Sequence, residues 1–278
     1  MEQQLIYTFT APEDGWFANS HYFATPDGVF VFDTQLVVDY AEALLEQIKT
    51  DVGDAEITSV FLTHPHPDHY NGAPLLSRRT KAVFYATKAS AKLIARRAEK
   101  ELGDLKAVYK KRLPHSVIKP DETFKDTKEF KWKGLTLRLT DVGLAESPSN
   151  LVCYIPERQA LISGDLIYNR VHLKFNDGNS EEWRSALQRI RGLKLKRVYP
   201  GHGPVVGAEI IPHLIRYIDH FQLAVEHFSR GKTMLDADDR RRIVSVMCDK
   251  YPDYQLPGNL EVSLDSEFAR QRGRRKAA

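Results

Sequence analysis

Seven residues in the first quarter of the chain place four metal-ligating side chains in one short turn. The segment His64-Pro65-His66-Pro67-Asp68-His69-Tyr70 contains three imidazoles and a carboxylate. Imidazole nitrogen and carboxylate oxygen are usual ligands of zinc, and iron and manganese also use them. Pro65 and Pro67 push the preceding histidines toward extended backbone, so alternate side chains can point into one pocket. The turn therefore predicts a metal site rather than a polar surface loop.

Composition narrows the class of protein. The 278 residues are 42% hydrophobic and 28% charged, which is ordinary for a globular protein with a buried core. A net charge of +3 is too small to predict nucleic-acid or membrane binding. No run approaches the roughly 18 apolar residues needed to span a bilayer, and no secretory signal is visible at residues 1–8.

The two cysteines bear on location. Cys153 and Cys248 both lie in apolar patterns, which is typical of buried thiols in a reducing compartment. We therefore expect a cytoplasmic protein that acts on a small-molecule substrate, without nucleic-acid or membrane partners. The sequence leaves the oligomeric state open.

Hydrophobic patterning predicts alternating strands and helices. Short runs rich in β-branched and aromatic residues predict strands, including 29–32, 57–62 and 160–162. Longer runs with helical spacing predict helices at 37–50 and after residues 180 and 208. Because each half runs through strands and then helices, we expect two similar layers that face each other.

Three more side chains with metal-ligand chemistry lie next to predicted strands. Asp165 and His202 each follow a short apolar strand, and Glu146 lies in a loop just before the strand at 151–155. Functional groups often collect on loops at strand ends over a rigid sheet. We therefore expect these three side chains to converge on the histidine turn.

At this point the sequence resembles the metallo-β-lactamase-fold metallohydrolases. The resemblance covers about residues 15–230, and its motifs run in the order of the family. The segments that carry it are Phe32-Asp33-Thr34, the H-x-H-x-D-H signature with its glycine at 63–72, Ile162-Ser163-Gly164-Asp165 and Pro200-Gly201-His202-Gly203.

The resemblance implies an α/β fold. In this family the fold is a four-layer αβ/βα sandwich, with two mixed sheets flanked by helices and a dinuclear metal site at one edge of the sheets. We expect this domain to span residues 1–230. A C-terminal helical extension at 231–268 is expected to pack on the same domain, followed by a basic, disordered tail at 269–278.

The same resemblance implies two divalent metal ions, zinc in preference to iron or manganese. Carried over position by position, one ion is held by His64 and His66. The other takes Asp68, His69 and His202, and Asp165 bridges the pair. Asp33 is expected to support a ligand histidine or its loop rather than to bind metal.

One position departs from the family pattern. Family members usually carry a further histidine in a Gly-His-Thr-like turn, whereas here Glu146 takes that place. We expect Glu146 to be a ligand; the alternative is that it is an unrelated loop residue and that Asp141 or water completes the shell. A carboxylate is a harder donor than imidazole, so it favours iron or manganese relative to an all-imidazole site. Similar glutamates occur in the alkylsulfatase-like hydrolases and the di-iron oxygenases of this fold.

The resemblance therefore implies a metal-dependent hydrolase. It would use a dinuclear-metal-bound hydroxide on a small ester, lactone, thioester or sulfate ester. The alternative is a di-iron, oxygen-activating oxidoreductase of the same fold. A nuclease is disfavoured by the modest charge, and a non-catalytic binding protein is disfavoured because only one ligand position is altered.

The catalytic candidates are Asp68, Tyr168 and His172. Tyr168 and His172 follow Asp165 closely in the chain, so both could bind substrate or stabilise an oxyanion. The alternative for each is a polar loop residue with no part in the chemistry.

Overall fold

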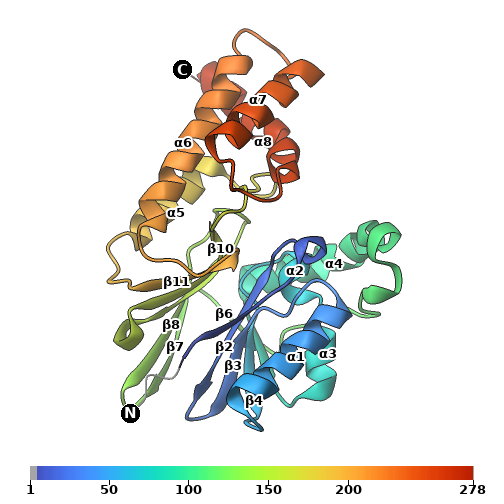
Figure 1. The fold of residues 1–278 in the computed structure, drawn as a ribbon, viewed down its shortest axis with the longest axis vertical. Helices are drawn as coiled ribbons and strands as arrows, with labels where there is room; N and C mark the ends of the chain where they lie inside the picture. The colour runs from blue at the N-terminus through green and yellow to red at the C-terminus, as the bar shows by residue number, and fades with distance from the viewer. Residues whose placement is uncertain (1–4, 278) are drawn as a thin grey trace.

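The computed structural model describes residues 5–277, which form two sheets that pack face to face (Figure 1). The first sheet has the order β1 (Tyr7–Thr10), β2 (Asn19–Thr25), β3 (Gly28–Phe32), β4 (Ile57–Phe61), β5 (Val83–Thr87), β6 (Glu122–Phe124). The second has the order β11 (Arg197–His202), β10 (Ala160–Tyr168), β9 (Leu151–Ile155), β8 (Leu135–Asp141), β7 (Thr127–Trp132). Both sheets are mixed, since each contains parallel and antiparallel neighbours.

Helices cover the outer face of each sheet. The first sheet packs against α1 (Val38–Val52), α3 (Ala73–Arg79) and α4 (Lys88–Tyr109), and the short α2 (Pro67–Tyr70) lies beside them. The second packs against α5 (Ser180–Ile190) and α6 (Ile210–Phe228), and α7 (Ala237–Lys250) and α8 (Gly258–Ala277) pack on α6. Figure 1 shows α5 to α8 grouped together, away from α1 and α3. The four-layer αβ/βα sandwich expected from the sequence is confirmed.

Strand periodicity explains why the layers form. In β3, Val29 and Val31 pack against the helices, while Phe30 and Phe32 face the second sheet. This is the two-residue alternation of a strand buried on both faces. Phe32 stacks on Phe61 of β4 with ring centroids 4.8 Å apart, at the centre of the core between the sheets.

The ends of three buried strands come together at one edge of this core. The histidine turn follows β4, and β10 and β11 run in parallel toward Asp165 and His202. Gly201 lets the two strands approach, because a Cβ there would lie 1.9 Å from Oδ1 of Asp165. The pairing of β10 with β11 shifts register after Ile162, where the chain bends toward the edge.

The C-terminal residues form helices that pack on the second sheet through α6. Helix α8 continues to Ala277, whereas the sequence predicts a disordered tail from residue 269; Ala278 lies outside the described residues. The helix continues because its next turn is anchored: Phe268 is buried, and Gln271 donates to the backbone oxygen of Gln222 in α6.

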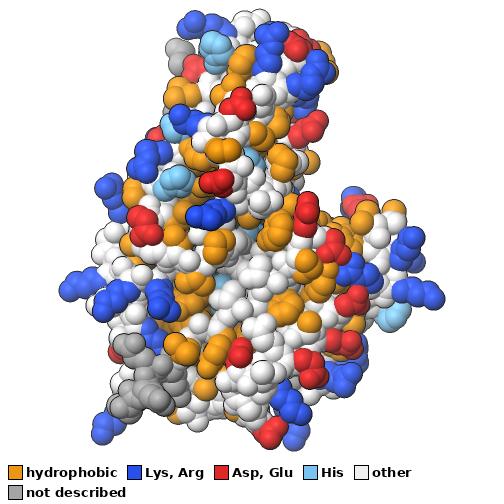
Figure 2. All heavy atoms as spheres, in the orientation of Figure 1, with side chains coloured by type: hydrophobic (Ala, Val, Ile, Leu, Met, Phe, Trp, Pro, Cys, Tyr) orange, Lys and Arg blue, Asp and Glu red, His pale blue; other side chains and the backbone are white. Residues whose placement is uncertain are grey.

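The surface shown in Figure 2 carries Lys and Arg side chains spread among Asp and Glu. Among the described residues, no helix combines the length and hydrophobicity that crossing a lipid bilayer requires.

We predict that Phe61→Ala lowers the free energy of unfolding by about 3–5 kcal/mol, because it opens a cavity between the two sheets where Phe61 is fully buried. Urea denaturation followed by circular dichroism measures the change. Leu223→Ala is the control, since Leu223 is 61% exposed on α6, and we expect a change within about 0.5 kcal/mol. Equal losses in the two variants would contradict the prediction.

Candidate metal centre

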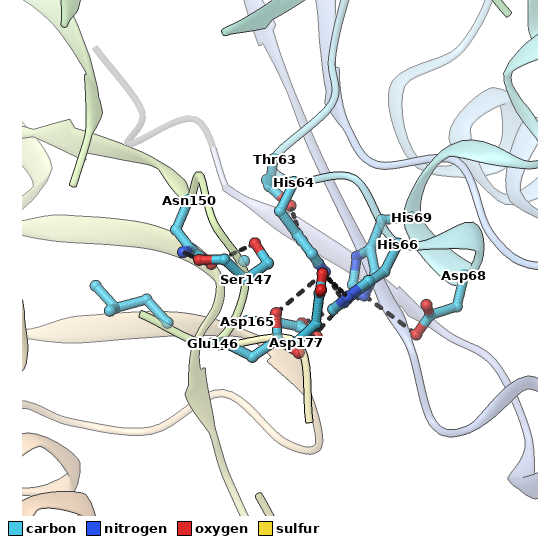
Figure 3. A network of polar contacts seen from close by, with 12 residues as sticks. Thr63, His64, His66, Asp68, His69, Glu146, Ser147, Asn150, Asp165 and Asp177 are labelled. Carbon is cyan, nitrogen blue, oxygen red and sulfur yellow. Dashed lines mark hydrogen bonds and ion pairs between the residues drawn. The ribbon is translucent and has the colours of Figure 1, made fainter. Parts of the chain in front are cut away.

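Seven buried side chains converge at the edge between the sheets and form two adjoining groups of donors. The first group is His64, His66, Glu146 and Asp165, and the second is Asp68, His69 and His202. Within each group the donor atoms lie within 4.8 Å of one another. Figure 3 shows the imidazoles of the histidine turn pointing at Glu146 and Asp165, which come from the other half of the chain. The structure thus brings together all seven ligands that the sequence predicts.

Asp33 orients the histidine turn through hydrogen bonds to Thr63 and His69. Its Oδ1 accepts the backbone N–H of Thr63 at 2.8 Å, and its Oδ2 accepts the Thr63 hydroxyl at 2.7 Å. The same Oδ2 lies 2.9 Å from Nδ1 of His69. Because the Thr63 hydroxyl gives its proton to Asp33, its oxygen is free to accept from Nδ1 of His64, 3.0 Å away. Asp33 therefore supports two of the predicted ligands, His69 directly and His64 through Thr63, and lies in neither donor group.

The other two imidazoles also have acceptors on their outer sides. Nδ1 of His202 lies 2.8 Å from the backbone oxygen of Trp16, and Nε2 of His66 lies 3.3 Å from Oδ2 of Asp177. An outer acceptor of this kind holds the proton on the outer nitrogen and fixes the ring orientation. The inner nitrogens are then lone-pair donors that face the cluster.

The inner nitrogens face one another closely. Nε2 of His64 lies 3.1 Å from Nδ1 of His66, and Nε2 of His69 lies 3.4 Å from Nε2 of His202. Two lone pairs at these distances repel unless a positive charge lies between them. The arrangement therefore fits a cation in each group of donors.

The buried carboxylates also favour a bound cation. Both oxygens of Glu146 and Oδ1 of Asp165 are buried and have no hydrogen-bond partner among the described residues. An ionised carboxylate buried without a partner is very costly, and coordination of a metal ion removes that cost. Buried histidine nitrogens and carboxylate oxygens that face one another are the donor set that zinc, iron and manganese use.

Asp165 lies between the two groups. Its Oδ2 is 3.3 Å from Nε2 of His64, and its Oδ1 is 3.2 Å from Nε2 of His69. The His202 Nε2 atom is also 3.2 Å away, from Oδ2. Asp165 thus contacts imidazoles of both groups, through Oδ2 to His64 and His202 and through Oδ1 to His69, which is the placement that a bridging ligand requires.

Glu146 belongs to the first group. Its Oε1 lies 3.2 Å from Nδ1 of His66, and its Oε2 lies 3.8 Å from Nε2 of His64. Asp141, the alternative ligand, instead accepts hydrogen bonds from loop groups such as the Ser149 hydroxyl and lies in neither donor group. The placement therefore favours Glu146 over Asp141 as the ligand.

The Glu146 loop is held rigidly. The Asn179 N–H donates to the backbone oxygen of Ala145 at 2.9 Å, and Asn150 donates to the oxygens of Gly143 and Ser147. Gly178 packs closely against the backbone of this loop, since a Cβ there would lie 2.3 Å from the Glu146 backbone oxygen.

The carboxylates draw positive charge into the site. Burial disfavours a charged His66, but the Glu146 carboxylate outweighs that cost and raises the pKa of His66 to about 9. Burial likewise opposes a charged His202, and the Asp165 and Asp68 carboxylates raise the pKa of His202 to about 9. In the protein without metal, protons on His66 and His202 therefore balance part of the negative charge of the carboxylates. Divalent cations would balance the same charge.

Of the catalytic candidates, Asp68 and Tyr168 lie in the site. The Tyr168 hydroxyl donates to Oδ2 of Asp165 at 2.7 Å, and its ring stacks on His202 with centroids 4.7 Å apart. Burial and the Asp165 carboxylate hold the pKa of Tyr168 well above its ordinary value, so the hydroxyl remains a proton donor.

The structure does not bring His172 into the cluster. Its Nδ1 lies 2.7 Å from the Tyr217 hydroxyl, and its Nε2 lies 3.9 Å from Sγ of Cys248, among the α6 and α7 helices. Burial lowers the pKa of His172 to about 4, which keeps the ring neutral. The chain turns away from the metal ligands between Tyr168 and His172.

Three groups beside the predicted ligands were not anticipated from the sequence: Asp177, Lys174 and the backbone oxygen of Trp16. Asp177 accepts from His66 and also from Nη1 of Arg97 at 2.6 Å. Lys174 and Trp16 line the cavity above the ligands. A lone aspartate, lysine or carbonyl carries no spacing pattern, so the sequence held no signal for them.

Comparison with known proteins agrees with this geometry. Residues 14–202 match the family model of the metallo-beta-lactamase superfamily. That range covers more than half of the chain and includes all seven donors, so the chain belongs to the metallo-beta-lactamase superfamily.

Three curated relatives are similar in sequence to this chain. The chain is 25% identical over 228 residues to a linear primary-alkylsulfatase of a Pseudomonas species, covering 69% of this chain and 42% of that protein. It is 26% identical over 184 residues to the beta-lactamase-like protein 2 homolog of Caenorhabditis elegans, covering 66% and 54%. It is also 26% identical over 190 residues to an atrochrysone carboxyl ACP thioesterase of a Cryptosporiopsis species, covering 68% and 49%. The chain thus spans about half the length of these relatives.

A solved structure supports the fold alone. The metallo-beta-lactamase of Pontibacter korlensis superposes with a TM-score of 0.63 at 23% identity, covering 79% of this chain and 96% of that one.

We predict that Asp33→Ala weakens metal binding by roughly 10–100-fold, because His69 and Thr63 lose the acceptor that orients them. Competition with a chromophoric chelator measures the affinity. Asp121→Ala is the matched control, since Asp121 accepts the Phe84 N–H in a different part of the first sheet. Equal affinities for the Asp33 variant and the unaltered protein would overturn the prediction.

Proposed function

We propose that the protein is a dinuclear-metal hydrolase that acts on a small ester, lactone, thioester or sulfate ester. The observation that carries the proposal is the pair of donor groups joined by Asp165, whose carboxylate lies within 3.3 Å of Nε2 of His64 in the first group and within 3.2 Å of Nε2 of His69 in the second. The seven donors would hold divalent ions, which would supply a hydroxide nucleophile near neutral pH and polarise the substrate oxygen. The chain needs no separate side-chain nucleophile.

The residues around the ligands have separate tasks in this proposal. His64, His66, Asp68, His69, Glu146, Asp165 and His202 hold the metal ions. Tyr168 orients the bridging carboxylate through its hydrogen bond to Asp165. Asp68 also faces the cavity as an ionised carboxylate, which can accept a proton from the attacking water and pass it to the leaving group. Burial opposes the charge of Asp68, but the facing His69 and His202 hold its pKa well below the ordinary value.

The relatives support the choice of reaction class. An alkylsulfatase and a thioesterase both transfer a polar acyl or sulfuryl group to water, and both are similar to more than half of this chain. Zinc is the metal we propose for the site. Glu146 gives the first group one more carboxylate than an all-histidine set would have, and hard oxygen donors favour manganese and iron. Activity with manganese and with iron is therefore to be compared with activity with zinc.

We expect hydrolysis of at least one member of a panel of aryl esters, lactones, acyl thioesters and alkyl sulfates by protein loaded with zinc, manganese or iron. EDTA should abolish the activity. Asp165→Asn should lower the rate by on the order of a hundredfold or more, since loss of a bridging ligand costs at least as much as loss of an outer partner. Initial rates and metal content measured on the same samples test this.

The same panel contains the result that would defeat the proposal. Metal-replete protein that hydrolyses no substrate, but reacts with dioxygen when loaded with iron and changes its visible spectrum, would favour the di-iron oxidoreductase instead.

Glu146→His should shift the metal preference of the site toward zinc, because imidazole replaces a hard oxygen donor. Metal content after dialysis against equimolar zinc, manganese and iron measures the shift. Glu157→His is the control, as Glu157 lies outside the donor groups and accepts from the Thr136 N–H. An unchanged zinc fraction in Glu146→His would remove Glu146 from the ligand set.

A further inference from the structure

The cavity above the metal ligands is walled by the C-terminal part of the chain. It has a volume of about 400 Å³, and its floor includes Asp68, Asp165 and His202. The opposite wall consists of Leu256, Gly258, Asn259 and Val262, at the start of α8 and just before it. These wall residues lie beyond residues 14–202, the part of the chain that the family model matches.

The wall is fixed to the segment that leaves β10. The Gln255 N–H donates to the backbone oxygen of Arg170, and the His172 N–H donates to the oxygen of Gln255 at 3.0 Å. Asn259 then donates to the backbone oxygen of His172 at 2.9 Å. The segment 254–259 therefore follows the end of β10 and holds its side chains over the metal ligands.

Two apolar side chains of this wall face the cavity. Leu256 adopts φ 56°, a left-handed conformation that is uncommon for a leucine and that persists only where the surroundings hold it. Val262 is 55% exposed and lines the same cavity, together with Trp16. Figure 2 shows hydrophobic side chains reaching the surface below α8. The half-buried Leu256 and Trp16 and the exposed Val262 together give a polar site an apolar side, which suits an apolar part of a ligand.

One cation lies on the same cavity. Lys174 lines the space above the ligands and also a neighbouring cavity that shares Trp16 and His66 with it. Among the described side chains, no carboxylate forms an ion pair with Lys174, in contrast to Arg97, which pairs with Asp177. Because the ligand carboxylates face the metal ions, the ammonium of Lys174 is available to an anion from outside.

We propose that this wall selects the substrate, and that the substrate is a single-chain anionic amphiphile. Its anionic group lies against Lys174, next to the metal ligands, and its unbranched apolar chain lies along Leu256, Val262 and Trp16. This inference rests on the proposed function and narrows it: among esters and sulfate esters, the site prefers those that join an anionic head to an apolar chain. Lys174, Leu256 and Val262 are the specificity-determining residues.

Binding of alkanesulfonates to the zinc-loaded, full-length protein tests the proposal apart from catalysis, because a sulfonate has no ester bond to hydrolyse. Isothermal titration calorimetry with butane-, hexane- and octanesulfonate should give an affinity that rises on the order of tenfold from four carbons to eight. This rise is smaller than complete burial of each added CH₂ would give, because the wall covers only part of the chain. Val262→Ser and Leu256→Ser should each flatten this dependence while leaving butanesulfonate affinity unchanged.

The head group is tested with the lysine. Lys174→Ala should weaken every sulfonate by about fivefold or more, Lys174→Arg should restore most of the affinity, and octanol binding should be the same in all three proteins. Leu223→Ser and Lys92→Ala are the matched controls, because both residues are exposed on helices and line none of these cavities. Circular dichroism confirms that each variant is folded.

Equal binding of butane- and octanesulfonate, or a chain-length dependence that persists in both wall variants, overturns the proposal. So does unchanged sulfonate binding in Lys174→Ala. If the sulfonates bind as expected and the substrate panel shows no hydrolysis, the hydrolase assignment fails while the wall remains a binding site for amphiphiles.

Discussion

A single buried carboxylate determines how the metal ligands face. Asp33 accepts from the Thr63 backbone, the Thr63 hydroxyl and the His69 ring, so it orients His69 directly and His64 through Thr63. These two imidazoles belong to different donor groups. An imidazole can present either nitrogen, and the outer hydrogen bond decides which one carries the proton. One residue outside the two donor groups therefore sets which nitrogen faces the site in one histidine of each group.

The site also depends on the contact between the sheets. The histidine turn follows β4 of the first sheet, while Asp165 and His202 lie on β10 and β11 of the second. Hydrogen bonds cross between the halves at the site itself: the Leu151 N–H donates to the Thr63 oxygen, and His202 donates to the Trp16 oxygen. The aromatic core between the sheets sets the separation that these short bonds require. Assembly of the donor groups is thus inseparable from packing of the two layers.

The ligands could be predicted from the sequence because coordination restricts residue type, and strand ends restrict position. His64, Asp165 and His202 met both conditions. The outer partners met neither: every residue has a carbonyl like that of Trp16, and Asp177 lies 111 residues from His66. The prediction for His172 assumed that the chain stays near the metals after Tyr168. Instead, Val171 pairs with Gln255, a contact between distant segments that no local pattern encodes.

This contact also explains what the buried His172 does. Its ring is held by the Tyr217 hydroxyl, and its backbone holds Gln255 and Asn259 on either side. The residue therefore ties α6 to the segment that carries Leu256, and so supports the wall of the cavity rather than its floor. Metal ligands must satisfy strict donor geometry, whereas a wall needs only shape and polarity. The donor groups lie within residues 14–202, whereas the wall that we propose to select the substrate lies outside that range, so the two can be altered separately.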